Sequence, residues 1–402
     1  MSTLHGWGRY PRVAGTLDAP DSGAGWSQAL RDRAPLIVRG LGRSYGDSAL
    51  GPHVVATRWL DRFQSFDPAT GALACDAGVS LDDILRLAIP HGWFLPVTPG
   101  TRFVTVGGAV ASDVHGKDHH ANGTFCMHLR HLDMLLGNGE QLRVSPTENA
   151  DLFHATCGGM GLTGVILGAA LQLKRIPSSV MEQTTLKLPA LDALLEAFDA
   201  EAAPPPPPPP PPAGGRRGGG PAPPPPPARA FNTVQYGHAR QGRSTRCVSL
   251  QSFFYPLDAL DQWNRLYGAG GFVQYQCVVP QAAGREALRD ILERIGQSGQ
   301  GCFLAVLKKF GPANGNHLSF PVLGYTLALD FRAEPAVFAL LDQLDAIVLH
   351  HGGRLYLAKD ARMSAASFRQ GYPRWQEFES VRARWHAHGR FASAQSRRLG
   401  LL

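Results

Sequence analysis

Two glycine-rich segments of this sequence carry the residue types best suited to holding a flat, anionic ligand. The first, residues 38 to 48, reads VRGLGRSYGDS and directly follows an apolar stretch typical of a buried strand. Glycine has no Cβ, so successive backbone amides in such a turn can approach a phosphate. The spacing is not the G-x-G-x-x-G of a Rossmann unit, because an arginine, a serine and a tyrosine follow Gly40 and Gly42. For this segment alone, a glycine-rich turn without a ligand is the alternative.

The second segment, residues 99 to 116, reads PGTRFVTVGGAVASDVHG. Its small residues would let a flat ring or a phosphate lie against the backbone. His115 and His119 are four residues apart, the spacing of zinc ligands on one helix face. However, the glycines at 116 and 123 disfavour a helix here, and no H-E-x-x-H motif occurs. We therefore expect no metal site.

The elements that must position these segments are short strands with few helices between them. Strands are predicted at 34–40, 53–59, 72–78 and 164–176, a helix after Ser80, a hairpin around 137–139, and a helix at 149–156. Beyond residue 230 we predict strands at 249–257, 272–280, 303–311 and 324–331, with amphipathic helices at 281–299 and 334–353. This order is typical of an α+β protein with a helix-backed antiparallel sheet.

The middle of the chain has a different composition. Residues 204–212 are nine consecutive prolines, a Gly/Arg stretch follows at 214–220, and five more prolines stand at 223–227. Proline lacks an amide hydrogen, so this stretch should be polyproline II joined to flexible coil. The interpretations are a disordered insert at about 202–229, a ligand for a proline-recognising domain, or a GC-rich gene stretch read in the wrong frame.

The bulk composition is that of a soluble globular protein, with 44% hydrophobic and 18% charged residues. No apolar run reaches membrane-spanning length and no signal-peptide core is visible, so we expect a cytoplasmic protein. Six scattered cysteines without a C-x-x-C pair are expected to be reduced thiols. The net charge of +7 suits an anionic cofactor, a phosphorylated substrate or a membrane surface. Nucleic acid is not expected as a partner, because no basic helix or recognition motif occurs.

The motifs together resemble the vanillyl-alcohol-oxidase (PCMH-type) family of FAD-binding oxidoreductases. The resemblance runs through GWGRYP, RGLGRSYGDSAL, TPGTRFVTVGGAVASDVHGKDHH, GLTGVILGA, FFYPLD, GGRLYLAKD and FASAQSRRLGL. It covers nearly the whole chain except the proline-rich insert. It implies a two-subdomain FAD-binding domain at residues 1–178, a substrate domain at 179–353, and a C-terminal segment at 354–402 that returns to the FAD domain.

The resemblance also implies which residues contact FAD. They are Arg39, Gly40, Leu41, Gly42, Arg43, Ser44, Tyr45, Gly46, Gly100, Thr105, Val106, Gly107, Gly108, Ser112, Asp113, Val114, His115, Ile166 and Tyr356. Relatives that link FAD covalently carry histidine where this chain has Arg43. Arginine cannot form that link, so we expect the FAD to be bound non-covalently.

For catalysis the matching positions are His115, Lys117, Gln276, Lys308 and Lys359. Lys359 is the first choice for a residue at the substrate hydroxyl, as a neutral base or as a cation that stabilises an alkoxide. The alternative is a surface lysine paired with Asp360. In a strand Lys308 and Lys309 face opposite sides, so one can face the site while the other faces water.

Within the family the chain is most similar to a subgroup that oxidises the C2 hydroxyl of a polyprenyl-phosphate pentose. The resemblance implies hydride transfer to FAD, a quinone or oxygen as acceptor, a short-chain reductase that completes epimerisation, and peripheral contact with the inner membrane. Two departures are Ala328, where the subgroup has cysteine, and the proline-rich insert. The alternatives are a sugar-lactone or alditol oxidase, a non-catalytic flavin-fold protein that binds partners through polyproline, and an FAD-independent scaffold.

Overall fold

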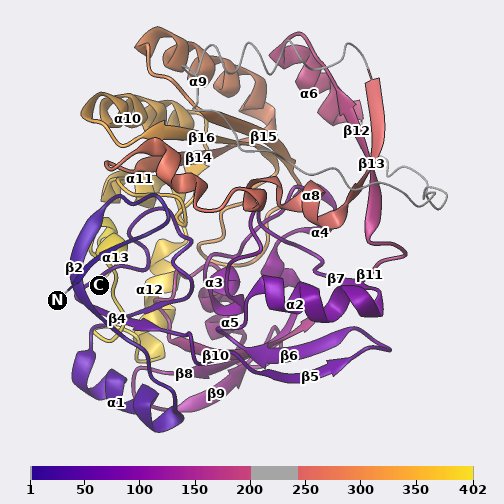
Figure 1. Cartoon of the computed structure of the whole chain (residues 1–402). Coiled ribbons are helices and arrows are strands. Elements are labelled where there is room, and N and C mark those ends of the chain that lie inside the picture. The colour runs from indigo at the N-terminus through magenta and orange to yellow at the C-terminus, as the bar shows by residue number, and fades with distance from the viewer. Residues whose placement is uncertain (1, 201–242, 402) are drawn as a thin grey trace.

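The computed structural model describes residues 2–200 and 243–401. The predicted insert at 202–229 lies outside these residues. The described chain is α+β, as expected, and Figure 1 shows one half built on two sheets below a second half built on a third sheet. Buried apolar residues of both halves, from Ile37 to Leu401, form one continuous core.

The first sheet carries the glycine-rich segment at its end. Its strand order is β1 (Ser2–His5), β2 (Arg12–Asp18), β4 (His53–Ala56) and β3 (Ile37–Arg39). β2 and β3 both run parallel to β4, while β1 pairs antiparallel with β2. α1 (Gly23–Arg33) packs Trp26 and Leu30 against this part of the chain. β3 ends at Arg39, so the segment from Gly40 onward leaves the sheet as a turn.

The second sheet is antiparallel and supports the second glycine-rich segment. Its order is β5 (Phe63–Asp67), β6 (Ala72–Asp76), β10 (Val165–Gln172), β8 (Leu129–Leu135) and β9 (Gln141–Val144). β8 and β9 form the predicted hairpin. α3 (Val106–Ala111) packs on β10, and α2 (Leu81–Ala88) begins at Ser80, whose side chain forms a capping box with Asp83. A small pair, β7 (Trp93–Phe94) with β11 (Lys174–Arg175), and the helices α4 (His119–Asn122) and α5 (Ala150–Thr156) complete this half.

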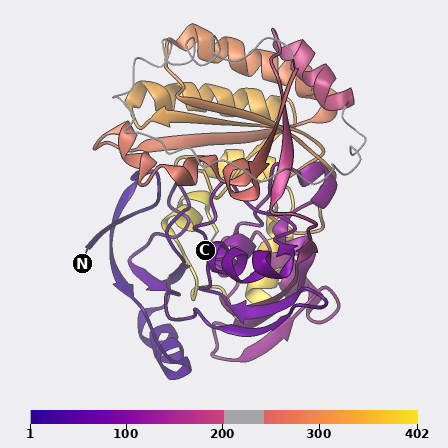
Figure 2. The ribbon, with the colours of Figure 1, turned by 45° about the vertical axis from the view of Figure 1, so that its right-hand side comes forward.

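The third sheet is antiparallel and covers the other two. Its order is β15 (Leu304–Phe310), β16 (Gly324–Arg332), β14 (Phe272–Pro280) and β17 (Arg354–Leu355). The helices α9 (Gly284–Ser298) and α10 (Pro335–His350) pack together on β14, on the side away from the first half (Figures 1 and 2). The antiparallel pair of β12 (Val180–Leu186) and β13 (Arg243–Ser249) stands beside it with α6 (Leu191–Ala200). The predicted helix-backed antiparallel sheet is therefore present.

One predicted strand is wrong. The stretch 249–257, with its alternating apolar residues, forms the helix α8 (Leu250–Phe254) and not a strand. The Ser249 side chain caps this helix by accepting a hydrogen bond from the Ser252 amide, and a turn at Pro256 follows it. The local start signal therefore outweighs the alternation.

The last part of the chain returns to the first half. The helices α12 (Trp375–Arg384) and α13 (Ala394–Leu399) lie beside the first half of the molecule in Figure 1, whereas α11 (Ala365–Gly371) contacts α10, β17 and α13. Phe391 bridges to Leu36 at the start of β3, and Arg398 of α13 pairs with Asp47 in the first glycine-rich segment. The domain boundaries at 178 and 353 stay a prediction. Within the described ranges, no helix combines the length and apolarity needed to cross a membrane.

Candidate functional site

A cavity of about 570 Å³ lies between the first half of the molecule and the third sheet. This size is typical of cofactor and ligand sites. Its wall takes residues from both glycine-rich segments, from β14, β15 and β16, and from the turn that contains Lys359. The predicted site residues that line it are Gly40, Leu41, Gly42, Arg43, Ser44, Tyr45, Gly100, Thr105, Gly107, Gly108, Ser112, Val114, His115, Lys117, Ile166, Gln276, Lys308, Tyr356 and Lys359.

The first glycine-rich segment offers unused backbone donors to the cavity. The amides of residues 40 to 44 donate no hydrogen bond to any other residue that the structure describes. All five residues line the cavity wall. Gly42 has a φ of +66°, a conformation that glycine adopts without strain. A run of free amides around such a turn is a nest for an anion.

The second glycine-rich segment offers space and no free donors at its helix start. The amide of Val106 donates to Val79, the amide of Gly107 donates to Ala77, and the amide of Gly108 donates to the Thr105 hydroxyl. No described atom lies within 4 Å of where a Cβ on Gly100 would stand. The segment therefore suits a flat group lying against the backbone, as expected, and does not suit phosphate binding by these amides.

Four residues predicted to contact FAD do not line the cavity: Arg39, Gly46, Val106 and Asp113. Asp113 is fully buried and points to the other side, where its carboxylate accepts hydrogen bonds from Asn314, Asn316 and Ser319. The Arg39 guanidinium donates to the backbone carbonyl of His5. The side chains of Arg39 and Asp113 therefore hold the two segments in place. Contact of these four residues with FAD stays a prediction.

His115 is a neutral, buried imidazole in the cavity wall. Burial, with the charges of Lys308, His119 and Lys359, lowers its pKa well below the ordinary value. The Gln276 side-chain nitrogen lies 3.0 Å from Nε2 and 3.2 Å from the Thr326 hydroxyl. The Thr326 hydroxyl donates to a carbonyl, so Gln276 is the donor in both contacts and His115 carries its proton on Nδ1. His115 Nδ1 has no partner among the described residues, which leaves a buried donor for an occupant of the cavity.

Three of the six lysines of the chain line the cavity: Lys117, Lys308 and Lys359. Burial and the charge of Lys117 lower the pKa of Lys308 to about 8, and burial lowers the pKa of Lys359 to about 7. Lys117 lies at the cavity rim and donates to the backbone carbonyl of Phe253. The neighbour Lys309 points to the other face of β15 and pairs with Asp199, as strand alternation predicts.

The turn from Tyr356 to Asp360 fixes Lys359 in the wall. The Lys359 and Asp360 amides donate to the Tyr356 carbonyl, and Lys359 Nζ lies 3.6 Å from the centroid of the Tyr45 ring. Neither Lys308 nor Lys359 makes a side-chain hydrogen bond or ion pair with any described residue. The alternative of a surface lysine paired with Asp360 is therefore wrong.

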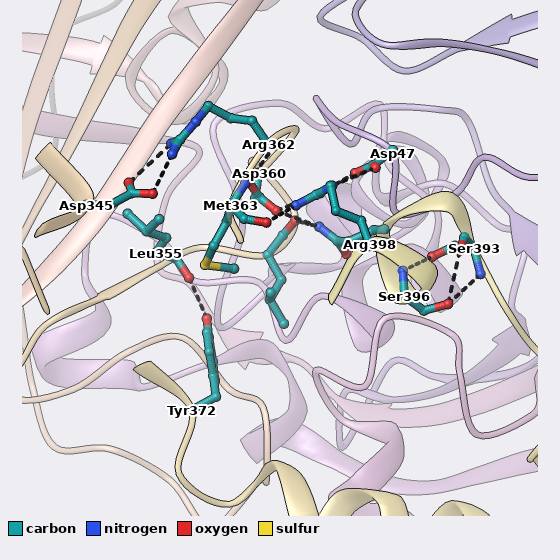
Figure 3. A network of polar contacts seen from close by, with 12 residues as sticks. Asp47, Asp345, Leu355, Asp360, Arg362, Met363, Tyr372, Ser393, Ser396 and Arg398 are labelled. Atoms are coloured by element: carbon teal, nitrogen blue, oxygen red, sulfur yellow. Dashed lines mark hydrogen bonds and ion pairs between the residues drawn. The ribbon is translucent and has the colours of Figure 1, made fainter. Parts of the chain in front are cut away.

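Asp360 instead belongs to a buried ionic network on the other side of the turn (Figure 3). Its carboxylate accepts from Arg398 at 2.8 Å and from the amides of Arg362 and Met363. Arg398 also donates to Asp47 of the first glycine-rich segment at 2.7 Å. One arginine thus connects the segment with free amides to the turn that carries Lys359.

An aromatic group that sequence reasoning missed surrounds Arg43. The guanidinium lies 4.1 Å from the Trp7 ring centroid and 5.6 Å from that of Phe103, and Trp7 meets Trp263 edge to face. Trp7, Trp263 and Gln274 line the cavity, as do Asp258 and Asp261. The motif GWGRYP around Trp7 was visible in the sequence, but no local pattern placed Trp7 and Trp263 at a shared site.

Comparison with known proteins agrees with this geometry. A model of the FAD binding domain matches residues 21–145. The chain is 37% identical to decaprenylphosphoryl-β-D-ribose oxidase of Mycolicibacterium smegmatis, over 99% of this chain and 97% of that protein. It is 31% identical to an uncharacterized Streptomyces coelicolor protein encoded in the mprA 5′ region, over 80% of this chain and 100% of the relative. Cytokinin dehydrogenase 4 of Arabidopsis thaliana is 29% identical over 36% of this chain and 29% of the plant protein.

Proposed function

Since this chain belongs to the family of decaprenylphosphoryl-β-D-ribose oxidase and has an FAD binding domain, we propose that it oxidises a secondary hydroxyl of a phosphorylated or lipid-linked sugar. The chain is an FAD-dependent oxidoreductase, so the resemblance inferred from its motifs is confirmed. The substrate that we favour is a polyprenyl-phosphate pentose oxidised at C2, with a quinone or oxygen as the final electron acceptor. The single observation that carries the substrate class is the gathering of three of the six lysines in one cavity.

The residues of the cavity fit FAD. The five free amides of residues 40 to 44 suit its pyrophosphate, and the small residues around Gly107 give room for a flat ring. The unpartnered Nδ1 of His115 is a buried donor that needs an acceptor from a ligand. When bound, FAD supplies the redox chemistry, because its isoalloxazine ring accepts a hydride from a carbon that carries a hydroxyl group.

The lysines suit a substrate with an anionic group. Lys117 and Lys308 present ammonium groups to the cavity, and Lys308 Nζ has no partner among the residues that the structure describes. A buried ammonium without a counter-charge is unfavourable, and a phosphate group would compensate it. We assign Lys308 and Lys117 to the substrate phosphate.

Lys359 takes the proton of the substrate hydroxyl. Burial lowers its pKa to about 7, so a large fraction of the side chain is a neutral amine at neutral pH. Loss of the hydroxyl proton together with a hydride from the same carbon turns the alcohol into a ketone. Gln276 holds the neutral His115 in one tautomer, and Gln276 itself lines the cavity where the sugar would bind.

The partners in this proposal follow from the product and the charge. A ketone at C2 needs a reductase, of the short-chain class, to return a hydride from the other face and complete an epimerisation. A lipid-linked substrate would bring the enzyme to a membrane surface, where the net charge of +7 favours contact with anionic lipid headgroups.

Anaerobic titration of the FAD-loaded protein tests the proposal. A polyprenyl-phosphoryl ribose should bleach the visible flavin band, and free ribose should not. Bleaching by a sugar lactone or an alditol without phosphate would instead favour the alternative oxidase. Bound FAD that none of these compounds reduces would overturn the proposal and favour a non-catalytic protein.

A further inference from the structure

Asp330 is a buried carboxylate without a cation in direct contact. It lies on β16, its exposed fraction is 0%, and no described lysine or arginine reaches it within ion-pair distance. Burying an ionised carboxylate in this way is unfavourable even when hydrogen bonds are made. A valine or a leucine at this position of β16 would avoid the burial of a charge. The carboxylate therefore indicates a role beyond packing.

The register of the sheet places Asp330 next to residues of the cavity wall. Its partner across β14 is Gln274, and its partner across β15 is Leu304. Both partners line the cavity, as does Ala328, two residues earlier on β16. Cross-strand partners and residues two apart share a face of a sheet, so the Asp330 carboxylate lies on the face that the cavity uses.

Two donors hold the carboxylate in its ionised form. The Gln274 side-chain nitrogen donates to Oδ1 at 2.6 Å, and the Tyr267 hydroxyl donates to Oδ2 at 3.1 Å. The Tyr267 ring is fixed by stacking on Phe272, with the ring centroids 4.2 Å apart. Burial raises the pKa of Asp330 to about 6, while Gln274, the charge of Lys359 and Tyr267 oppose the rise. The group is therefore ionised at neutral pH.

The negative charge of Asp330 acts on the ammonium form of Lys359. Burial lowers the pKa of Lys359, the carboxylate of Asp330 raises it, and the charge of Lys308 lowers it again. His115 faces the same space as a neutral ring, and the Tyr45 phenol, whose pKa burial raises, is also uncharged. The carboxylate of Asp360, next in sequence, is turned towards Arg398.

We propose that Asp330 is a positioning residue that sets the basicity of Lys359, by stabilising the ammonium ion that forms when Lys359 takes the substrate proton. Gln274 and Tyr267 serve this role by keeping Asp330 ionised. The inference rests on the proposed role of Lys359 in the oxidation. Without Asp330 the amine is a weaker base, so it is neutral over a wider pH range but accepts the proton less readily.

The direct test is a titration of the lysines themselves. The chain has six lysines, so FAD-loaded protein labelled with ¹³C at lysine Cε should give few resonances, and Lys359→Met identifies the one of interest. Asp330→Asn should lower the pKa of Lys359 by about 1 unit or more. Asp345→Asn is the matched control: Asp345 is also a buried aspartate, but it pairs with Arg362 and should leave Lys359 unchanged.

A second variant tests the inference if Asp330→Asn does not fold. Gln274→Met keeps the Asp330 carboxylate and removes its shorter hydrogen bond, so it should shift the titration of Lys359 in the same direction but less. If Asp330→Asn folds and the pKa of Lys359 is unchanged, the inference is wrong. If Asp330→Asn does not fold, an unchanged pKa of Lys359 in Gln274→Met shows the same. This readout needs no substrate, so it is independent of whether the proposed sugar is correct.

The pH profile of flavin reduction supplies the functional readout. In Asp330→Asn the rising limb should move to lower pH, and the plateau rate should fall by up to about tenfold for each unit by which the pKa of Lys359 is lowered. A merely structural role would lower the rate without moving the limb, and that result would contradict the inference. If the proposed sugar fails to reduce the flavin while the titration shifts as expected, the substrate is wrong and the role of Asp330 stands.

Discussion

The backbone carbonyl of Asp360 occupies the space that a Cβ atom on Gly46 would take. The segment with the free amides and the turn that carries Lys359 are therefore in backbone contact. Gly46→Ala would force the two apart, since neither side of the contact is a flexible side chain. We expect the variant to lose about 2 kcal/mol or more of unfolding free energy and to bind FAD more weakly.

The control for this substitution lies five residues away. Gly51 is also buried, but its nearest neighbours would be 3.6 Å or more from a new Cβ, which is ordinary contact. Thermal unfolding and FAD titration of the two alanine variants test this predicted difference. Equal behaviour of Gly46→Ala and Gly51→Ala would contradict the packing argument.

Arg398 should be needed for the stability of the site. Arg398→Ala leaves the buried carboxylates of Asp47 and Asp360 without their shared cation (Figure 3). We expect a loss of about 2–5 kcal/mol in unfolding free energy and weaker FAD binding. Arg397, on the same helix but exposed, is the control whose replacement by alanine should change little. A small loss in Arg398→Ala would show that the network does not join the two segments.

Lys308 should lower the unfolding free energy of the ligand-free protein and should be needed for ligand binding. Its pKa is lowered from 10.5 to about 8, so folding the charged lysine is unfavourable below pH 8, and the penalty disappears as the pH rises towards 10.5. Lys308→Met should therefore raise the unfolding free energy of the ligand-free protein by about 1–3 kcal/mol at pH 7. The gain should fade above pH 8. The same variant should weaken binding of the phosphorylated sugar at least tenfold.

Lys309→Met is the matched control for that experiment. The two lysines are adjacent on β15, but Lys309 faces away from the cavity and pairs with Asp199. Its replacement should leave sugar binding unchanged and should not stabilise the protein. Calorimetry across pH and a binding titration with the phosphorylated sugar give both readouts. A stabilised Lys309 variant would argue against the assignment of the cavity-facing lysine.

Flavin reduction should depend on the neutral form of Lys359. Because the pKa of Lys359 is about 7, the rate of anaerobic reduction should rise with pH around neutrality and then level off. Lys359→Met should lower the plateau by about 10²–10⁴-fold. Lys359→Arg should not rescue it, because a guanidinium stays protonated. Full activity of the arginine variant would mean that position 359 acts through its charge.

The flavin should leave the protein on acid precipitation. Position 43, which carries the linking histidine in covalent relatives, is here an arginine in contact with Trp7 and Phe103. Precipitated protein should therefore be colourless, with the flavin absorbance in the supernatant. Colour retained in the pellet would show a covalent link through another residue.

The sequence predicted best where a pattern is local. The capped helix after Ser80, the hairpin of β8 and β9, and the alternation of Lys308 and Lys309 each depend on neighbours within a few residues. A local pattern was wrong at 249–257, because the alternating apolar residues predicted a strand where the capping Ser249 begins a helix.

Contacts between distant elements were beyond local patterns. An aspartate inside the apolar strand TLALDF was a visible anomaly, but its partners Gln274 and Tyr267 become neighbours only once the register of β14 and β16 is known. Likewise, no sequence pattern near Arg398 predicts its ion pair with Asp47. The residues that line the cavity could be predicted from motifs, whereas the buried charges next to them required the assembled sheet.

The connection between Asp47 and Arg398 also bears on how the protein is made. The two residues are 351 positions apart, so a chain that is still being synthesised completes its first glycine-rich segment long before it contains the arginine that fixes that segment to the turn of Lys359. Contacts of such separation form late and slowly in folding. The cavity is therefore complete only after the chain has been made as far as Arg398.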